Sequence, residues 1–395
     1  MTTTPRVTVL MTVYNGLPYL PQAIESVLNQ TFTDFEFVII DDASTDGSVA
    51  CIRRYADPRI RLWCNERNLG QASSLNTGLT LSRAPYIARM DQDDICLPDR
   101  LRQQVNLLEA RPDIAAVGTL MYWLRANGDI VGVVGLKMHN CGAFLGTLLS
   151  TASPLGHSTV MYRRDIVADA GGYDVSFAPC EDYELWCRLA LRGYRASVIP
   201  EPLVMLRIHG QQQSITRSAL QRQHVRRAHE RFVTTWCQPN QARLVSSLLQ
   251  LNEAFWEECR SQGAVWTVLQ ALDGTLDTMR ITLGLNHQED AALRRCVSWW
   301  LGRCAFMAIL QRHRQSLPVY LFALQGGIRA LSYPAILAYP GCFAFAPLFV
   351  PRVRETLVRL ARTLNQQRYV LRLLGHGLKS RLSGIPLLPK GSPWS

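Results

Sequence analysis

The fold of this 395-residue chain is decided by the stretch Arg6-Val-Thr-Val-Leu-Met-Thr-Val13, which Tyr14-Asn-Gly16 follows directly. The stretch is β-branched and largely apolar, which is typical of a parallel strand whose two faces are both buried. Apolar residues then recur at helical spacing at Leu20, Ile24 and Val27. The stretch therefore predicts the first strand and the first helix of an α/β domain.

The alternation of strand and helix continues toward residue 90. Further strands are expected at residues 36–40, 59–63 and 86–90, and further helices after residues 44–47 and over residues 70–82. Ser44 or Thr45 is positioned to cap the helix that follows residue 47. Short connections between alternating strands and helices predict an α/β fold with a doubly wound, mostly parallel sheet.

Polar side chains follow the ends of these predicted strands. In a doubly wound sheet, ligands bind beyond the carboxyl ends of the strands. We therefore expect one site to gather Thr12, Tyr14, Asn15, Asp41, Asp42, Asp91, Asp93 and Asp94.

The run Asp91-Gln-Asp-Asp94 places three carboxylates within four residues, directly after the strand predicted at 86–90. Like charges this close repel one another and are costly to desolvate, so the cluster calls for a partner. A divalent cation is a natural partner, because hard cations prefer oxygen ligands. A cation held there could bind the diphosphate of a nucleotide. The alternative is a solvated acidic turn that caps the next helix.

Two candidate residues lie further along the chain. Asp182 stands in the run Glu181-Asp182-Tyr-Glu184 at the start of a predicted helix, where acidic residues also serve as ordinary partners of the helix dipole. His157 precedes a short predicted strand, and a hydrogen-bonded structural histidine is the favoured interpretation. Before these, residues 114–123 and 130–134 predict a hairpin whose turn is Asn127-Gly128.

An ordered set of short motifs resembles family 2 glycosyltransferases of the GT-A fold. The resemblance covers residues 5–215, and each motif is weak alone, but their order and spacing make the set specific. The motifs are Thr12-Val-Tyr-Asn15, Ile40-Asp-Asp-Ala-Ser-Thr-Asp-Gly47, Asn68-Leu-Gly70 with Asn76, Asp91-Gln-Asp-Asp94, Gly171-Gly-Tyr-Asp174, Glu181-Asp182, Leu185-Trp186 and Arg207-Ile-His209.

The resemblance implies transfer of a sugar from a nucleotide diphosphate donor, with inversion at the anomeric carbon, by an enzyme of the hexosyltransferase type. It implies Asp182 as the general base, and Asp91 and Asp93 as a DxD motif that holds Mn²⁺ or Mg²⁺, with His209 in a loop that contacts metal or diphosphate. It also implies a nucleotide-sugar pocket formed by Thr12, Tyr14, Asn15, Asp41, Asp42, Asn68, Asn76 and Asp91.

Charge divides the chain into two unlike parts. Residues 1–214 carry 19 Lys and Arg against 22 Asp and Glu, whereas residues 215–395 carry 23 against 9. We therefore expect a catalytic domain over residues 1–215 and a basic, mainly α-helical C-terminal region over residues 216–395. The helical region is expected to pack on the catalytic domain or on its partner. The N-terminus lacks the pattern of a signal peptide, which favours a cytoplasmic protein.

The C-terminal region contains two segments that could contact a membrane. Residues 330–350 contain no charged side chain, but Pro334, Pro340 and Pro347 disfavour a regular spanning helix. An interfacial or re-entrant segment, followed by a basic amphipathic helix over 353–374, would place the protein peripherally on the inner face of the plasma membrane. A buried helical core with a solvated basic face is the alternative.

Two other functions are open. A nucleotidyltransferase also uses acidic metal ligands, but it usually needs a basic, glycine-rich phosphate loop, and Thr12-Val-Tyr-Asn-Gly16 has no Lys or Arg. A catalytically degenerate binding protein is the second, although no nucleic-acid recognition motif supports such a partner. The expected partners are a nucleotide-sugar donor and a glycan or lipid-linked acceptor in cell-envelope synthesis.

Overall fold

The computed structural model describes residues 4–310, apart from residues 126, 136–137, 139, 151–152, 211, 213–215 and 251–261. By its internal contacts the chain divides into a compact unit of residues 1–330 and a second unit of residues 331–395. Every described residue therefore belongs to the first unit. The predictions for residues 330–350 and 353–374 lie outside the described residues.

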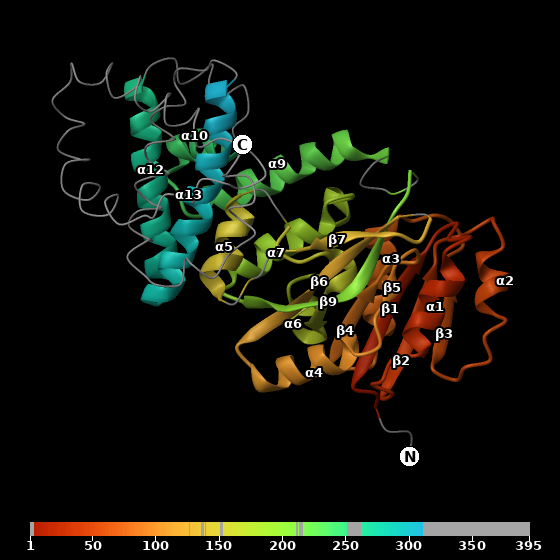
Figure 1. Ribbon diagram of the computed structural model, residues 1–395. Coiled ribbons are helices and arrows are strands. Elements are labelled where there is room, and N and C mark those ends of the chain that lie inside the picture. The colour runs from red at the N-terminus through yellow and green to blue at the C-terminus, as the bar shows by residue number, and fades with distance from the viewer. Residues whose placement is uncertain are drawn as a thin grey trace, which may run out of the picture. The chain divides into compact units, whose positions relative to one another are not determined.

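Strands and helices alternate through the first half of the chain (Figure 1). The strands are β1 (Val7–Val13), β2 (Phe35–Asp41), β3 (Ile60–Cys64), β4 (Tyr86–Met90), β5 (Ile95–Cys96), β6 (Ile114–Arg125), β7 (Ile130–Val134), β8 (Met161–Arg163) and β9 (Arg195–Ile208). The α-helices between them are α1 (Leu20–Leu28), α2 (Ser48–Ile52), α3 (Gln71–Leu81), α4 (Arg100–Ala110), α5 (Cys141–Leu149), α6 (Arg164–Asp169) and α7 (Glu181–Leu191). Short 3₁₀ turns cover His157–Thr159 and Val175–Phe177.

The sheet is mixed and has the order β3-β2-β1-β4-β8-β6-β9-β5, with β7 paired to β6. Strands β1 to β4 pair in parallel, as the sequence predicts, and β6 pairs in parallel with β9. Strands β8, β5 and β7 add antiparallel pairs. The carboxyl ends of β1, β2 and β4 therefore lie at one edge of the sheet, where ligands are expected.

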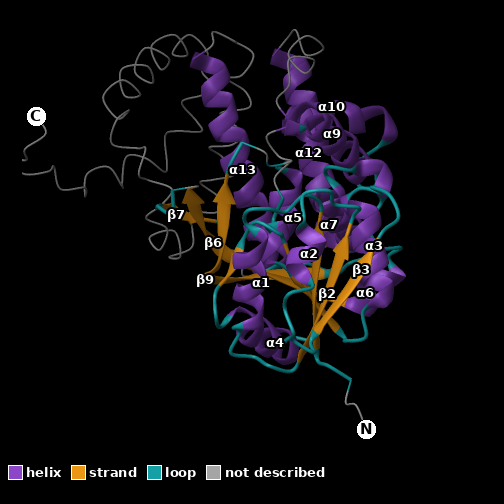
Figure 2. Ribbon diagram, turned by 90° about the vertical axis from the view of Figure 1, so that its right-hand side faces the viewer, coloured by secondary structure: helices purple, strands orange, loops and turns teal. Residues whose placement is uncertain are grey.

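Helices cover both faces of the sheet (Figure 2), which confirms the doubly wound prediction. Successive residues of β1 point to opposite faces, and all seven are buried. Val9 and Met11 pack in one core with α1 and α4. Leu10 packs in the other core with α3, where Gly78 lets the helix approach so closely that a Cβ there would overlap the Leu10 side chain.

One expectation about a helix start is wrong. Helix α2 begins after Gly47, which has φ +92°, and neither Ser44 nor Thr45 caps it. Asp46 accepts the backbone N–H of Ser48 instead, at 3.0 Å. The Ser44 hydroxyl instead accepts the backbone N–H of Asn15 at 2.9 Å.

Beyond the sheet the described chain is helical, as predicted. The helices are α9 (Ser218–Thr234), α10 (Pro239–Gln250), α12 (Gln262–Thr282) and α13 (His287–Leu310). Helix α9 packs on α7, and α13 packs on α5 through Gly142 and Gly146, where a Cβ would overlap Glu289 or Cys296. The core that contains Leu10 continues without a break to Leu301.

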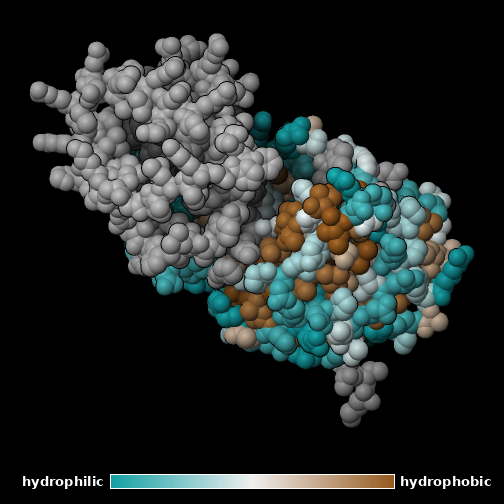
Figure 3. All heavy atoms as spheres, viewed as in Figure 1, coloured by the Kyte–Doolittle hydropathy of each residue, from teal (hydrophilic) through white to brown (hydrophobic). Residues whose placement is uncertain are grey.

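Apolar side chains gather on one face over the β6–β7 hairpin (Figure 3). Trp123, Ile130, Val131 and Val133 are 40–53% exposed. Among the described helices, none combines the length and the apolar character that crossing a bilayer requires.

Candidate functional site

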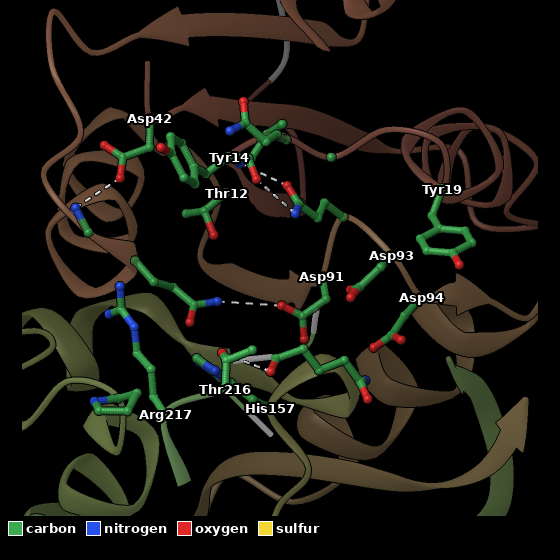
Figure 4. A pocket seen from close by; sticks show the side chains of 18 of the residues that line it. Thr12, Tyr14, Tyr19, Asp42, Asp91, Asp93, Asp94, His157, Thr216 and Arg217 are labelled. Carbon is green, nitrogen blue, oxygen red and sulfur yellow. Dashed lines mark hydrogen bonds between the residues drawn. The ribbon is translucent and has the colours of Figure 1, made fainter. Parts of the chain in front are cut away.

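The strand ends open into a pocket of about 620 Å³, called here the strand-end pocket. In Figure 4, Thr12 and Asp91 lie between Asp42 on one side and Asp93 with Asp94 on the other. The predicted site residues that line the pocket are Thr12, Tyr14, Asn15, Asp42, Asn68, Asp91, Asp93, Asp182 and His209.

Two predicted site residues do not line this pocket. Asp41 is 1% exposed, and its carboxylate accepts the backbone N–H of Ser44 at 3.0 Å. Asn76 lies on α3 and exchanges two hydrogen bonds of 2.8 Å with the backbone of Tyr173. Both side chains therefore fix backbone behind the pocket. The role in nucleotide binding that the sequence predicts for them stays a prediction.

Asp42 organises the loop that carries Asn68. Its carboxylate accepts the side-chain amide of Asn65 and the backbone N–H groups of Leu69 and Gly70, each at 2.8 Å. A carboxylate offers about four lone-pair sites, so one remains for a ligand. Gly70 has φ +84°, a conformation that a side chain would strain. Hydrogen bonds therefore join the Asp42 motif directly to the Asn68-Leu-Gly70 motif.

The turn after β1 is held by its neighbours. Gln92, the residue between the two aspartates of the DxD motif, accepts the backbone N–H of Tyr14 at 2.8 Å and donates to its carbonyl at 3.2 Å. Asn15 adopts φ +50°, and its side chain accepts the backbone N–H of Thr45 at 2.8 Å. These bonds join the ends of β1, β2 and β4, so the residues of the turn face the pocket in a defined arrangement.

Asp91, Asp93 and Asp94 form the acidic cluster of the site. One carboxylate oxygen of each lies within 4.8 Å of the others. Asp94 is 2% exposed, and its second oxygen accepts the backbone N–H of Arg207 at 2.9 Å. Burial and repulsion from Asp91 raise the pKa of Asp93, and the same two causes raise the pKa of Asp94 well above its usual range. Ionisation of one carboxyl in the cluster thus disfavours ionisation of its neighbours.

This donor set fits a divalent cation. Hard oxygen ligands clustered at a pocket wall are what Mn²⁺ or Mg²⁺ takes, and a cation would relieve the repulsion that raises the two pKa values. Ser158 contacts both Asp91 and Asp94 through its one hydroxyl.

Arg89 balances one member of the cluster. It is 1% exposed on β4 and forms an ion pair with Asp91. Burial would raise the pKa of Asp91, but the nearby guanidinium brings it below its usual value. Burial likewise would lower the pKa of Arg89, and Asp91 raises it. Asp91 therefore stays ionised while its neighbours are pushed toward protonation.

The end of β9 closes the cluster from the other side. Arg207 donates to the backbone carbonyl of Asp93 at 3.0 Å and lies over the ring of Tyr19 at 4.5 Å. His209 stands 2.8 Å from Asp93, measured from its Nε2 to a carboxylate oxygen. The predicted partnership of Asp93 and His209 is thus geometrically close, although 116 residues separate them.

Glu181 and Asp182, at the first turn of α7, also line the pocket. Burial raises the pKa of Asp182, which also accepts a hydrogen bond from Ser153 at 3.3 Å. Burial and the charge of Asp182 raise the pKa of Glu181 to about 7. His157 lies 3.4 Å from the hydroxyl of Tyr173, and burial together with Arg89 lowers its pKa well below the usual value. Two carboxyls whose pKa values are raised by burial therefore line the pocket.

Some lining residues were not assigned to the site from the sequence. Arg89 and Gln71, for which the sequence left contact with nucleotide or sugar open beside a structural role, line the pocket together with Glu181, and Arg217 enters from the helical region. An arginine in the apolar strand 86–90 was a usable signal for Arg89. Nothing in the sequence marks Arg217 among the many arginines of its region. Trp186 of the Leu185-Trp186 motif is fully buried and belongs to the core.

Comparisons with known proteins agree with these motifs. The family model described as Glycosyl transferase family 2 matches residues 8–169. EpsE of Bacillus subtilis (strain 168) is 34% identical over 212 residues, which are 52% of this chain and 74% of EpsE. The O-antigen biosynthesis glycosyltransferase WbnJ of Escherichia coli is 32% identical over 220 residues, which are 54% of this chain and 83% of WbnJ.

A solved structure is similar over most of the chain. The mannosyltransferase PcManGT from Pyrobaculum calidifontis, in complex with GDP-Man and Mn²⁺, superposes with a TM-score of 0.47 at 20% sequence identity. The superposition covers 84% of this chain and 88% of that one.

Proposed function

Because this chain belongs to glycosyl transferase family 2, we propose that it transfers a hexose from a nucleoside diphosphate donor to an acceptor hydroxyl, with inversion at the anomeric carbon. One observation carries the proposal. The strand-end pocket is lined both by the acidic cluster of Asp91, Asp93 and Asp94 and by the half-buried carboxyl of Asp182. Family membership also disfavours the alternative of a nucleotidyltransferase.

The donor is proposed to occupy the strand-end side of the pocket. Asp42 keeps one acceptor site for a ribose hydroxyl or a base, beside Thr12, Tyr14, Asn15 and Asn68. Asp91, Asp93 and His209 would hold Mn²⁺ or Mg²⁺, and a bound cation supplies Lewis-acid stabilisation of the leaving diphosphate. Asp41 and Asn76 would act as positioning residues, since their hydrogen bonds are to backbone behind the pocket.

Asp182 is proposed as the general base. A single displacement forms the bond from the acceptor oxygen to the anomeric carbon while the bond from that carbon to the diphosphate oxygen breaks. The electron pair leaves with the diphosphate, and the acceptor proton passes to Asp182. The pKa of Asp182 is raised by burial, which makes it a better proton acceptor than an exposed aspartate. No covalent intermediate is required, so one carboxylate suffices.

The biological setting is proposed from the relatives. WbnJ is named for O-antigen biosynthesis and AmsE of Erwinia amylovora, 30% identical over 205 residues, for amylovoran biosynthesis. We therefore favour synthesis of a cell-envelope glycan in the cytoplasm, at the inner face of the plasma membrane. The acceptor would be a glycan or a lipid-linked sugar.

The test is thermal stability of the full chain against UDP-, GDP- and dTDP-sugars, each with Mn²⁺ and with EDTA. A ligand that binds the native state raises its stability by about 2.7 kcal/mol at a hundredfold excess over the dissociation constant. We expect one nucleotide class to raise the melting temperature only with Mn²⁺, and Asp93→Asn to abolish this rise.

Thr77→Ala is the matched control, because Thr77 lies on α3 outside the pocket lining. Its response to the donor should equal that of the wild type. A donor that stabilises the wild type equally in Mn²⁺ and in EDTA would contradict the proposed metal site. No response to any donor in the panel would count against the donor pocket.

A further inference from the structure

A second pocket, of about 420 Å³, adjoins the strand-end pocket; we name it the α9 pocket. Residues of α7 and α9 line it, together with Ser153, Cys180 and Gln250. Asp182 and Gln221 line both pockets, so the proposed base lies at their junction. A molecule in the α9 pocket could therefore present a group to Asp182 while a donor fills the strand-end pocket.

The two pockets carry opposite charge. The carboxyls that line the strand-end pocket outnumber its two guanidinium groups and are Asp42, Asp91, Asp93, Asp94, Glu181 and Asp182. The α9 pocket is lined by Arg222 and Arg226 against the single carboxyl of Asp182. The first arrangement attracts cations, and the second attracts an anion.

The positions of Arg222 and Arg226 are unfavourable for the free energy of folding. They lie four residues apart on α9, where like charges on one helix face repel each other. Both are exposed, and neither has an ion pair with another described residue. Two other arginines of the same helix have partners, since Arg227 lies over the ring of Phe177 at 4.2 Å and Arg231 stands 3.8 Å from Glu184. The pair in the pocket is thus the one available to a ligand.

We infer that the α9 pocket is the acceptor subsite and that the acceptor carries an anionic group, a phosphate or a carboxylate, near the hydroxyl that reacts. Guanidinium groups bind either anion through paired, charge-assisted hydrogen bonds. The anion would be held by Arg222 and Arg226, which directs the neighbouring hydroxyl toward Asp182. The inference rests on the proposed function, because it takes Asp182 as the base.

The experiment measures binding of three small probes to the full chain in EDTA and without nucleotide. The probes are glucose 1-phosphate, glucuronate and neutral glucose. The acidic strand-end pocket repels anions under these conditions, so anion binding reports the α9 pocket. We expect an anionic probe to bind about tenfold more tightly than glucose, and the variant Arg222→Gln/Arg226→Gln to lose about tenfold in affinity for it. The preferred anion then identifies the source, phosphate or carboxylate.

The matched control is Arg227→Gln/Arg231→Gln, which removes the same charge from the same helix outside both pockets. It should bind the anionic probe as the wild type does, with circular dichroism confirming that both variants are folded. Equal binding of glucose and the anions, equal loss in both double variants, or no anion binding would overturn the inference. Its failure is distinguishable from failure of the proposed function, because donor binding is measured separately with nucleotide and Mn²⁺.

Discussion

The two carboxyls at the start of α7 differ in what surrounds them, and this difference bears on the proposal of Asp182 as the base. Asp182 lies at the junction of both pockets, whereas Glu181 lines only the strand-end pocket. We expect Asp182→Asn to lower kcat by about 10²–10⁴-fold, the usual contribution of a general base, without loss of donor binding. The measurement is steady-state kinetics together with donor affinity.

Glu181→Gln provides the comparison for this prediction. Because the pKa of Glu181 is about 7, roughly half of this group already carries a proton at neutral pH. Its neutral substitute should therefore cost much less activity than Asp182→Asn. A larger loss in Glu181→Gln would assign the base to Glu181.

The buried residue His229 makes the stability of the protein depend on pH. It is fully buried, its ring nitrogens lie 2.9 Å from the Ser246 hydroxyl and 3.0 Å from the Leu149 carbonyl, and burial lowers its pKa to about 4. The unfolded chain binds this proton near pH 6.5, whereas the folded chain binds it near pH 4. The stabilisation is thus complete above pH 6.5 and lost as the pH falls toward 4, by about 3 kcal/mol.

Urea unfolding between pH 7.5 and 4.5 measures this dependence. In His229→Gln, the side chain cannot titrate. The fall in unfolding free energy across that interval should therefore be smaller, by about the contribution of the one proton that His229 binds. An unchanged pH dependence would mean that His229 is accessible to protons in the folded state.

At the scale of elements, α5 and α13 are joined by a close helix contact. Gly142 has no room for a side chain, because a Cβ there would overlap the backbone of Glu289. The ion pair of Arg195 with Glu289, at 2.6 Å, fixes the same end of α13 to β9. We expect Gly142→Ala to destabilise the protein by about 1–3 kcal/mol, the usual cost of overpacking. Differential scanning calorimetry would measure the change.

Gly274→Ala is the control for this contact. Gly274 lies within α12, and a Cβ there would meet nothing within 4 Å. Alanine should stabilise that helix by up to about 1 kcal/mol, because glycine is the poorer helix former. Destabilisation by both substitutions would show that glycine is needed in these helices for another reason.

At the scale of the whole molecule, the question is whether the described helical region is a separate domain. The sequence predicts a boundary near residue 215, and that boundary stays a prediction. One continuous core nevertheless runs from Leu10 on β1 through α5 and α7 to Leu301 on α13. We therefore expect the backbone amides of α5 and α13 to exchange with solvent through the same unfolding event. Hydrogen exchange should then give equal opening free energies for the two helices. Hydrogen exchange read by mass spectrometry tests this.

A lower opening free energy for α13 than for α5 would argue for an independent helical domain. The internal reference is β1, whose seven residues are all buried and which pairs on both edges. Its amides should report the global unfolding free energy of the unit.

Local pattern was enough to predict strands β1 to β4 and much of the candidate site. The strands of the parallel sheet are short apolar runs, and the residues that follow them meet because parallel strands end at one edge. The same reasoning could not separate Asp42 from Asp41. Adjacent residues at a strand end point in opposite directions, and only the packing shows that Asp42 faces the pocket while Asp41 is turned to the Ser44 backbone.

By itself, the sequence determined the strand and helix order of residues 6–90, the acidic cluster after β4 and the resemblance to a transferase family. These depend on residues close together in the chain, whose periodicity and charge act locally. Only the tertiary structure joined His209 to Asp93 and placed Arg222 and Arg226 beside Asp182. Those relations depend on how β9, α7 and α9 pack, and packing is set by the fit of whole surfaces rather than by any short stretch of sequence.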